Sequence, residues 1–487
     1  MIQNNPSTSA NKEVGFVISA QDYLLYLVGL PTAHVNDILV SEKGGRALVT
    51  SLARDKIEAL MLDGERPHPG DYFEKSSTGL SLPISKNLFG RTINPLGAAL
   101  DGKAGLPPRG VAIDLDAIAP GINFREIVSE QLQTGITVVD TLLPIGIGQR
   151  ELIFGDPRSG KSSFLLDIII NQKDKNAVCV YGAIGKSEID VKKFGEQLEA
   201  AGGASYTIIL AATSSESAPI ISIAPSVACS IAEVFRNEGK DVLMILDDLG
   251  THSKYLREIA LLSGRIPGRE SYPADIFYQH SHLIERAGNF NSKVGGGSIT
   301  LLPVIETDLE NFTNLIPTNV MSMTDGHILF SAALRSEGQY PSIEPGRSVT
   351  RVGYQTQLLI QKELADKVRY LLAEYHELER YGRFGGELTS ATQLTIKIGN
   401  IATELLRQEP LMRIEPIVQV LLLALLFSSF FDEKDIEFAR KYKTKIIETL
   451  TNDPIFKELA QKSIKTKLTD LIDELKKNHK TLENICR

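Results

Sequence analysis

The feature that most constrains this chain is a run of eight residues, Gly155-Asp156-Pro157-Arg158-Ser159-Gly160-Lys161-Ser162. The run satisfies G-x-x-x-x-G-K-[ST], the pattern of a phosphate-binding loop. An apolar stretch before it (151–154) predicts a strand, and the stretch after it (162–170) predicts the start of a buried helix. In that setting the two glycines let the backbone curl so that successive N–H groups point at phosphate oxygens. The sequence therefore predicts an α/β domain that binds a nucleoside triphosphate or diphosphate.

Polar side chains in and near this loop have expected roles. Lys161 would neutralise the β and γ phosphates, and the hydroxyl of Ser162 is placed to ligate magnesium, with Ser163 beside it. Asp247 ends an apolar strand at 242–246, which fits the magnesium-holding aspartate of such ATPases. A turn with an incidental lysine, or a strand that merely ends in aspartate, would explain either pattern alone. Their combination predicts bound Mg-ATP or Mg-ADP, with Ser162 and Asp247 on the metal side.

A hydrolase also needs a group that orients the attacking water, and phosphate-loop ATPases commonly place a glutamate after the next strand. Here that strand (178–181) leads into Ile184-Gly185, and the next residue is Lys186. A lysine cannot accept a proton as a carboxylate does. Glu188 lies two residues further on, where the backbone would have to shift to deliver it. The site is predicted to hold a nucleotide and to be poorly equipped to split it.

Composition excludes several classes of protein. The net charge is −8 at pH 7 and no basic cluster is present, which argues against nucleic-acid binding. Three cysteines without metal-ligand spacing favour a reducing compartment. The first twelve residues lack a signal pattern, and the most apolar stretch (416–431) is short for a bilayer span and contains Gln419. No membrane insertion is expected.

The chain divides into three regions of different texture. Short strands separated by turns predict a β-barrel over 1–72, alternating strands and helices predict an α/β domain over 73–357, and the remainder (358–487) predicts a helical bundle. The expected helices of the bundle are 362–381, 391–406, 417–431, 435–449 and 465–478.

Further motifs carry a resemblance to a known family. They are Gln133-Thr134-Gly135-Ile136, Gly148-Gln149-Arg150-Glu151-Leu152, Pro267-Gly268-Arg269-Glu270-Ser271-Tyr272-Pro273, Gly295-Gly296-Gly297-Ser298, Pro303-Val304-Ile305-Glu306-Thr307, Ile316-Pro317-Thr318-Asn319-Val320, Thr324-Asp325-Gly326 and Ser348-Val349-Thr350-Arg351. In this order the chain resembles the α subunit of F-type ATP synthases, from residue 13 to the helical tail, most weakly in the last hundred residues. Several of these motifs are shared with β subunits and with related rotary and export ATPases.

The resemblance implies roles for particular residues. The central domain would be RecA-like, and its nucleotide would be bound without turnover. The family's arginine finger falls on Arg351, which would reach the active site of a neighbouring β subunit. Ser348 matches a serine required for activity, and Ser322 a residue facing the same interface. The adenine pocket maps to Tyr340-Pro341 and Gln408.

The resemblance also implies an assembly. Three α and three β subunits would surround a γ shaft, with a peripheral stalk, in the head of a proton- or sodium-transporting ATP synthase or ATPase. The head would lie peripherally at the cytoplasmic face of the bacterial inner membrane. Only about a dozen polar residues precede Glu13, so we expect δ not to dock through the usual N-terminal helix.

Other positions depart from the family pattern. The loop carries Pro157-Arg158-Ser159 in place of Arg-Gln-Thr, Lys186 replaces a glutamine, Gly264 interrupts a run usually occupied by arginine, and Pro410 replaces a second adenine-side glutamine. These departures favour a divergent paralogue of the alternative sodium- or proton-pumping type that lacks δ.

Two other classes are compatible with a phosphate-binding loop. A self-sufficient motor of the export or flagellar type needs a carboxylate at Lys186. A nucleic-acid-translocating motor needs a basic, aromatic-bearing path, which the acidic balance and the absence of tryptophan disfavour. A scaffold without nucleotide binding is disfavoured by the intact loop.

Overall fold

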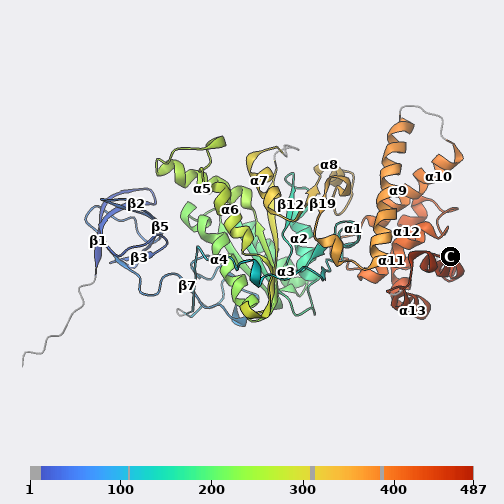
Figure 1. Cartoon of the computed structure of the whole chain (residues 1–487), viewed down its shortest axis with the longest axis horizontal. Coiled ribbons are helices and arrows are strands. Elements are labelled where there is room, and N and C mark those ends of the chain that lie inside the picture. The colour runs from blue at the N-terminus through green and yellow to red at the C-terminus, as the bar shows by residue number, and fades with distance from the viewer. Residues whose placement is uncertain (1–12, 108–109, 308–312, 384–388, 465, 486–487) are drawn as a thin grey trace, which may run out of the picture.

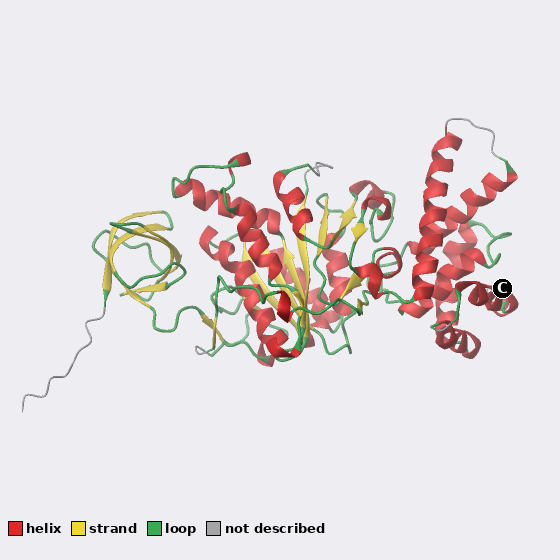
Figure 2. Cartoon of the chain, in the orientation of Figure 1, coloured by secondary structure: helices red, strands yellow, loops and turns green. Residues whose placement is uncertain are grey.

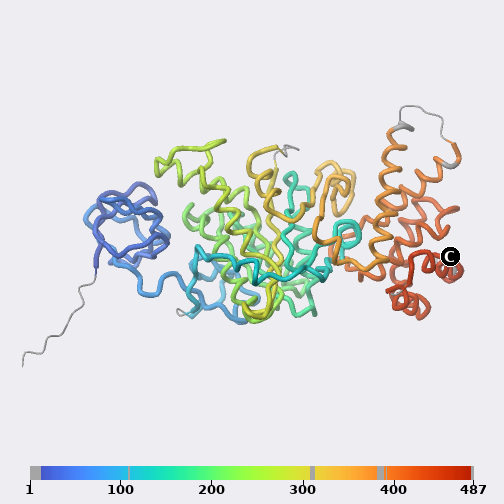
Figure 3. Tube along the Cα trace, in the orientation of Figure 1, coloured from blue at the N-terminus to red at the C-terminus, as the bar shows by residue number. Residues whose placement is uncertain are grey.

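The computed structural model of the chain describes residues 13–107, 110–307, 313–383, 389–464 and 466–485. It shows three bodies in a row, a β-barrel, a central α/β domain and a helical domain (Figure 1). Strands are confined to the first two bodies and the third is built from helices (Figure 2). The trace passes through the bodies in chain order (Figure 3). This arrangement confirms the predicted fold class.

Six strands form the closed barrel, in the order β1-β2-β5-β4-β3-β6. Their bounds are β1 Val14–Gln21, β2 Leu24–Gly29, β3 Ile38–Ser41, β4 Arg46–Leu52, β5 Ile57–Asp63 and β6 Tyr72–Lys75. The expected domain boundary at 72/73 falls inside β6, which pairs with both β1 and β3. Since Phe73 is fully buried in the barrel core, the barrel extends through Lys75.

The central sheet has the order β19-β18-β12-β17-β15-β13-β14-β8, with β16 paired to β17. Its strands are β8 Thr92–Ile93, β12 Glu151–Gly155, β13 Val178–Lys186, β14 Thr207–Thr213, β15 Asp241–Asp247, β16 Gly288–Asn289, β17 Ser298–Glu306, β18 Gly326–Phe330 and β19 Val349–Thr350. The pairings from β18 to β8 are parallel, and β19 adds an antiparallel edge. Continuous apolar strands fit a sheet buried on both faces.

Helices cover this sheet. They are α2 Lys161–Ile170, α3 Glu188–Ala200, α4 Ala218–Asn237, α5 Leu249–Leu262, α6 Ile276–Glu285 and α7 Leu315–Met323. Helix α4 is long and apolar enough to cross a bilayer, but 78% of its apolar window is buried and it packs on β13, β14 and β15. Its hydropathy is therefore explained by the core of the central domain.

The helical domain comprises α9 Leu359–Arg383, α10 Ser390–Leu406, α11 Pro416–Ala424, α12 Ile436–Asn452, α13 Pro454–Ser463, α14 Leu468–Lys477 and α15 His479–Ile485. The predicted helix 417–431 is shorter than expected, because α11 ends at Ala424 and a 3-10 turn follows over Leu425–Phe427. The predictions contained no counterpart of α13.

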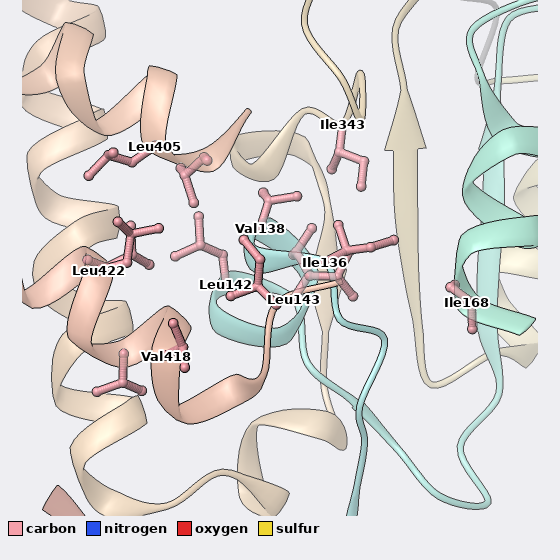
Figure 4. Close-up of a cluster of buried hydrophobic side chains, with 14 of the residues drawn as sticks. Ile136, Val138, Leu142, Leu143, Ile168, Ile343, Leu405, Val418 and Leu422 are labelled. Atoms are coloured by element: carbon pink, nitrogen blue, oxygen red, sulfur yellow. The ribbon is translucent and has the colours of Figure 1, made fainter. Parts of the chain in front are cut away.

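A continuous apolar core joins the helical domain to the central domain. Helix α1, Thr137–Leu142, presents Val138 and Leu142 toward Leu405 of α10 and toward Val418 and Leu422 of α11 (Figure 4).

A buried carboxylate reinforces the same joint. Asp140 of α1 accepts hydrogen bonds from the backbone N–H groups of Thr134 and Gly135 and from the side-chain amide of Gln419 on α11. Burial raises the pKa of this carboxyl, and the same hydrogen bonds oppose the shift. The two domains therefore share one core and one polar junction.

The junction also depends on a glycine that has no room for a side chain. A Cβ on Gly353 would collide with the Pro144 carbonyl, whereas one on Gly346 would meet nothing within 4 Å. We expect Gly353→Ala to destabilise the protein by about 1–3 kcal/mol through overpacking. Thermal unfolding followed by circular dichroism measures the effect, with Gly346→Ala as the matched control. Equal unfolding midpoints for the two variants would contradict the expectation.

Candidate nucleotide-binding site

The phosphate-binding loop connects β12 to α2 at the carboxyl edge of the parallel sheet. Gly155 and Gly160 have φ of 145° and 95°, values that side-chain-bearing residues rarely adopt. A Cβ on Gly155 would also collide with the carbonyl of Phe330 on the neighbouring strand β18. The two glycines of the motif are thus required by the backbone path, which places the start of α2 at the loop.

Lys161 lies over this loop. Its ammonium donates to the carbonyls of Gly155 (2.9 Å) and Asp156 (2.7 Å) and lies 3.9 Å from a carboxylate oxygen of Glu306. Burial lowers the pKa of Lys161, and the nearby Glu306 opposes that shift. The ammonium is therefore held at the loop where a phosphate would be bound.

Asp247 lies at the end of β15 with both carboxylate oxygens engaged. The ammonium of Lys186, at the end of the adjacent strand β13, lies 2.9 Å from Oδ1, and the Tyr181 hydroxyl donates to Oδ2 at 2.8 Å. Burial lowers the pKa of Lys186, but the carboxylates of Asp247, Asp248 and Glu306 together outweigh it and raise that pKa to about 12. Lys186 is thus a charged partner of a carboxylate that is 2% exposed.

The neighbouring Asp248 has a structural partner. Its carboxylate accepts from the backbone N–H (2.8 Å) and the hydroxyl (3.0 Å) of Thr251, capping α5. Burial raises the pKa of Asp248 to about 6, and Lys186 opposes this shift. Asp248 therefore contributes mainly to the start of α5.

Magnesium does not fit Asp247 in this arrangement. Magnesium in phosphate-loop sites needs carboxylate or hydroxyl oxygens, reached directly or through water. Ser162 is exposed at the start of α2, but each oxygen of Asp247 already accepts a hydrogen bond, one from Tyr181 and one from Lys186. A dication beside Asp247 would also face the Lys186 ammonium. The residues fit a phosphate chain better than a metal ion.

Glu188 is not directed at the loop. It is the exposed first residue of α3, and its carboxylate accepts from the Ser215 hydroxyl at 2.6 Å, in the turn after β14. Lys186 is therefore the residue that ends β13, and Glu188 does not take its place at the loop.

The residues Tyr340 and Pro341, predicted to line the adenine pocket, lie beside α2. Tyr340 and Pro341 are buried, and the Tyr340 hydroxyl donates to Asp167 of α2 at 2.5 Å. The Arg335 guanidinium lies 5.2 Å from the centre of the Tyr340 ring. Asp167 also accepts from the backbone N–H of Leu411. These contacts anchor the segment next to the helix that begins at the loop.

Gln408 has no hydrogen-bonding capacity left for a base in this arrangement. Its carbonyl accepts from the N–H (2.9 Å) and the hydroxyl (3.0 Å) of Thr137, and its NH₂ donates to the carbonyls of Gly135 (2.7 Å) and Met412 (2.5 Å). A glutamine amide offers two acceptor sites and two donors, and all four are used. Gln408 joins the two domains where an adenine contact was expected.

Arg351 lies far from the loop of its own chain. Arg351 is exposed and directly follows β19. Thr350 of β19 pairs with Gly326 of β18, and Gly326 pairs with Glu151 of β12. The loop begins at Gly155, the other end of β12. Four residues at about 3.3 Å each separate the two ends by roughly 13 Å along the strand. Arg351 therefore lies beside the end of β12 that is opposite the loop.

The two expected interface serines differ. Ser322 is exposed near the end of α7, with its hydroxyl donating to the Thr318 carbonyl at 2.9 Å. Ser348 is 9% exposed; its hydroxyl donates to the Glu344 carbonyl (2.7 Å) and accepts from the Leu329 N–H (3.0 Å). Ser322 and Arg351 flank the start of β18, while Ser348 holds the preceding loop.

Two residues of the site, Glu306 and Ser342, had no expected role. Glu306 ends β17 in register with Gly155, and Ser342 donates its hydroxyl to the carbonyl of Ser159 in the loop. A sequence pattern could have identified Glu306, because it ends an apolar strand as Asp247 does. Ser342 had none, since its contact spans 183 positions of the chain.

Comparison with known proteins gives two family matches. Residues 135–350 match the nucleotide-binding domain of the ATP synthase alpha/beta family, and residues 357–482 match the C-terminal domain of the ATP synthase alpha/beta chain.

Curated relatives match nearly the whole chain. The ATP synthase subunit alpha of Caldanaerobacter subterraneus subsp. tengcongensis is 37% identical, covering 96% of this chain and 92% of the relative. Subunit alpha 1 of Mycoplasmopsis pulmonis is 36% identical (99% and 93%), and subunit alpha of Aquifex aeolicus is 37% identical (96% and 94%).

The contacts of Gln408 predict a structural phenotype. We expect Gln408→Ala to lower the free energy of unfolding by about 2–4 kcal/mol, because buried groups of Thr137 and Gly135 lose their partners. ATP affinity of the folded variant should change less than about threefold. Thermal unfolding and ATP titration measure the two effects. Gln355→Ala, which removes a single exposed bond to Val128, is the control. A large loss of affinity with unchanged stability would restore the base-binding role.

Proposed function

The chain belongs to the ATP synthase alpha/beta family, and on that premise we propose that it is the α-type subunit of a rotary ATP synthase head. It binds ATP or ADP without splitting it and supplies Arg351 to the active site of a neighbouring β subunit. The observation that carries the proposal is the placement of two cations. Lys186 ends β13, and Arg351 lies beside the end of β12 that is opposite the loop.

The phosphate-binding loop supports nucleotide binding, and its surroundings support the lack of turnover. Among the described residues near the loop, Asp247 is paired with Lys186, Asp248 caps a helix and Glu188 is bonded to Ser215. Glu306, at the end of β17, lies 3.9 Å from the Lys161 ammonium. No carboxylate at the end of β13 is available to orient a water.

The position of Arg351 supports action on a partner. An arginine finger stabilises charge on the transferring phosphoryl group from close range. Since roughly 13 Å of strand separates Arg351 from its own loop, the side chain serves a site outside this chain. Exposed Ser322 lies at the same edge and belongs to the proposed interface, and Ser348 supports the loop that leads to Arg351.

The proposed assembly is a ring of three such subunits and three β subunits around a γ shaft, with a peripheral stalk. It couples ATP synthesis or hydrolysis to proton or sodium transport and lies peripherally at the cytoplasmic face of the bacterial inner membrane. The segment relevant to δ docking, residues 1–12, lies outside the described residues. Nucleotide binding is proposed without magnesium at Asp247, because that carboxylate is already paired.

A first test uses the purified chain alone. We expect ATP binding that is lost in Lys161→Ala and no steady-state hydrolysis, with or without magnesium. Calorimetric titration and a phosphate-release assay on the same sample measure the two properties. Turnover that requires Lys161 and disappears in Glu306→Gln would instead identify a self-sufficient motor with Glu306 as its base.

A second test uses the assembly reconstituted with β and γ. We expect Arg351→Ala to reduce multisite ATP turnover by about a thousandfold or more, while ATP binding by this chain stays within about threefold. Arg347→Ala is the matched control, since this exposed arginine pairs with Glu344 of its own chain. Equal losses of turnover and of binding in Arg351→Ala would point to a folding role.

A further inference from the structure

The charge distribution beside the loop differs from that of a magnesium-dependent phosphate site. The carboxyl ends of β12, β17, β15 and β13 meet at one edge of the sheet. Lys161 and Lys186 contribute two ammonium groups there, and Asp247, Asp248 and Glu306 contribute carboxylates. At the end of β13 a neutral or acidic side chain would leave Asp247 unpaired and open to a cation, whereas Lys186 pairs with it.

Lys186 retains capacity for another anion. An ammonium has three donors, and the single Asp247 contact at 2.9 Å uses one of them. The side chain of Lys186 is 22% exposed, whereas that of Asp247 is 2% exposed. Burial lowers the pKa of Lys161, and repulsion by the Lys186 charge adds to that shift. A phosphate bound between them would relieve that repulsion.

A metal ion at the same place meets two obstacles. Each oxygen of Asp247 already accepts one hydrogen bond, Oδ2 from Tyr181 and Oδ1 from Lys186, so a metal-bound water would have to share an oxygen with one of them. A dication would also lie beside an ammonium that Asp247 holds in place. In phosphate-loop sites the metal neutralises the β and γ phosphates, and here a lysine supplies positive charge instead.

We propose that Lys186 takes the place of magnesium beside Asp247, so that this chain binds a nucleoside di- or triphosphate without a divalent cation. The proposal rests on the nucleotide-binding function proposed above. It assigns to Lys186 direct binding of the β or γ phosphate, with Asp247 and Tyr181 as positioning residues that hold the ammonium.

The test is ATP titration of the full chain in excess magnesium and in excess EDTA. We expect wild-type dissociation constants that agree within about threefold. Lys186→Gln should bind ATP about tenfold or more weakly in EDTA and regain affinity on addition of magnesium. Lys192→Gln is the control, because this lysine is 78% exposed on α3 and should leave both constants unchanged.

A second measurement needs only the wild-type chain and is independent of whether the variant folds. The paramagnetic resonance signal of free Mn²⁺ is recorded in a mixture of Mn²⁺ and ATP. A chain that binds metal-free ATP releases the ion, so adding protein should raise the signal. A fall in the signal would show that the metal enters the site with the nucleotide and would overturn the inference.

The outcomes separate this inference from the proposed function. Wild-type binding that weakens more than about tenfold in EDTA overturns the inference and leaves the nucleotide-binding function in place. Absence of ATP binding in both buffers, with a normal unfolding transition, overturns the proposed function itself.

Discussion

The parallel pairing of β12, β17, β15 and β13 is the constraint on which the rest of this structure depends. Parallel strands bring their carboxyl ends to one edge, where the chain must leave the sheet and polar groups can be exposed. The loop, Glu306, Asp247 and Lys186 all come from that edge. A buried carboxylate is tolerated only when it is paired, and the adjacent strand β13 supplies Lys186 to Asp247. The chemistry of the site follows from this pairing.

Much of the fold could be predicted from local patterns. Strands of the barrel, the long apolar strands of the sheet and most helices of the third domain have periodicities that act within a few residues. Local periodicity failed to separate two helices that follow each other without a loop. Asp453 both ends α12 and caps α13, so the two helices follow each other directly and the second was missed. Similarly, β6 follows a turn-rich stretch, and its assignment to the barrel depends on pairing with β1 and β3.

The site was predictable where a motif prescribes backbone shape, and less so where side chains choose partners. Gly155 and Gly160 have the positive φ that the motif requires, and Lys161 lies at the loop. Two partners of Gln408, Thr137 and Gly135, lie 271 and 273 positions away, and Lys186, which pairs with Asp247, lies on another strand. No local pattern encodes these contacts. A resemblance to a family predicts where a residue lies in the fold. Its hydrogen-bond partners depend on the neighbouring residues of this chain.

The loop and Arg351 lie at opposite ends of β12, so this subunit would present a different face to each of its two neighbours in a ring. A chain that offers an arginine on one face and a nucleotide on another makes head-to-tail contacts, which are heterologous and close into a ring when the rotation permits. A ring made of this chain alone would direct every arginine at a loop whose neighbouring strand ends in Lys186. Such a ring would have interfaces but no working centre. The function proposed for Arg351 therefore calls for a second type of subunit that alternates with this one.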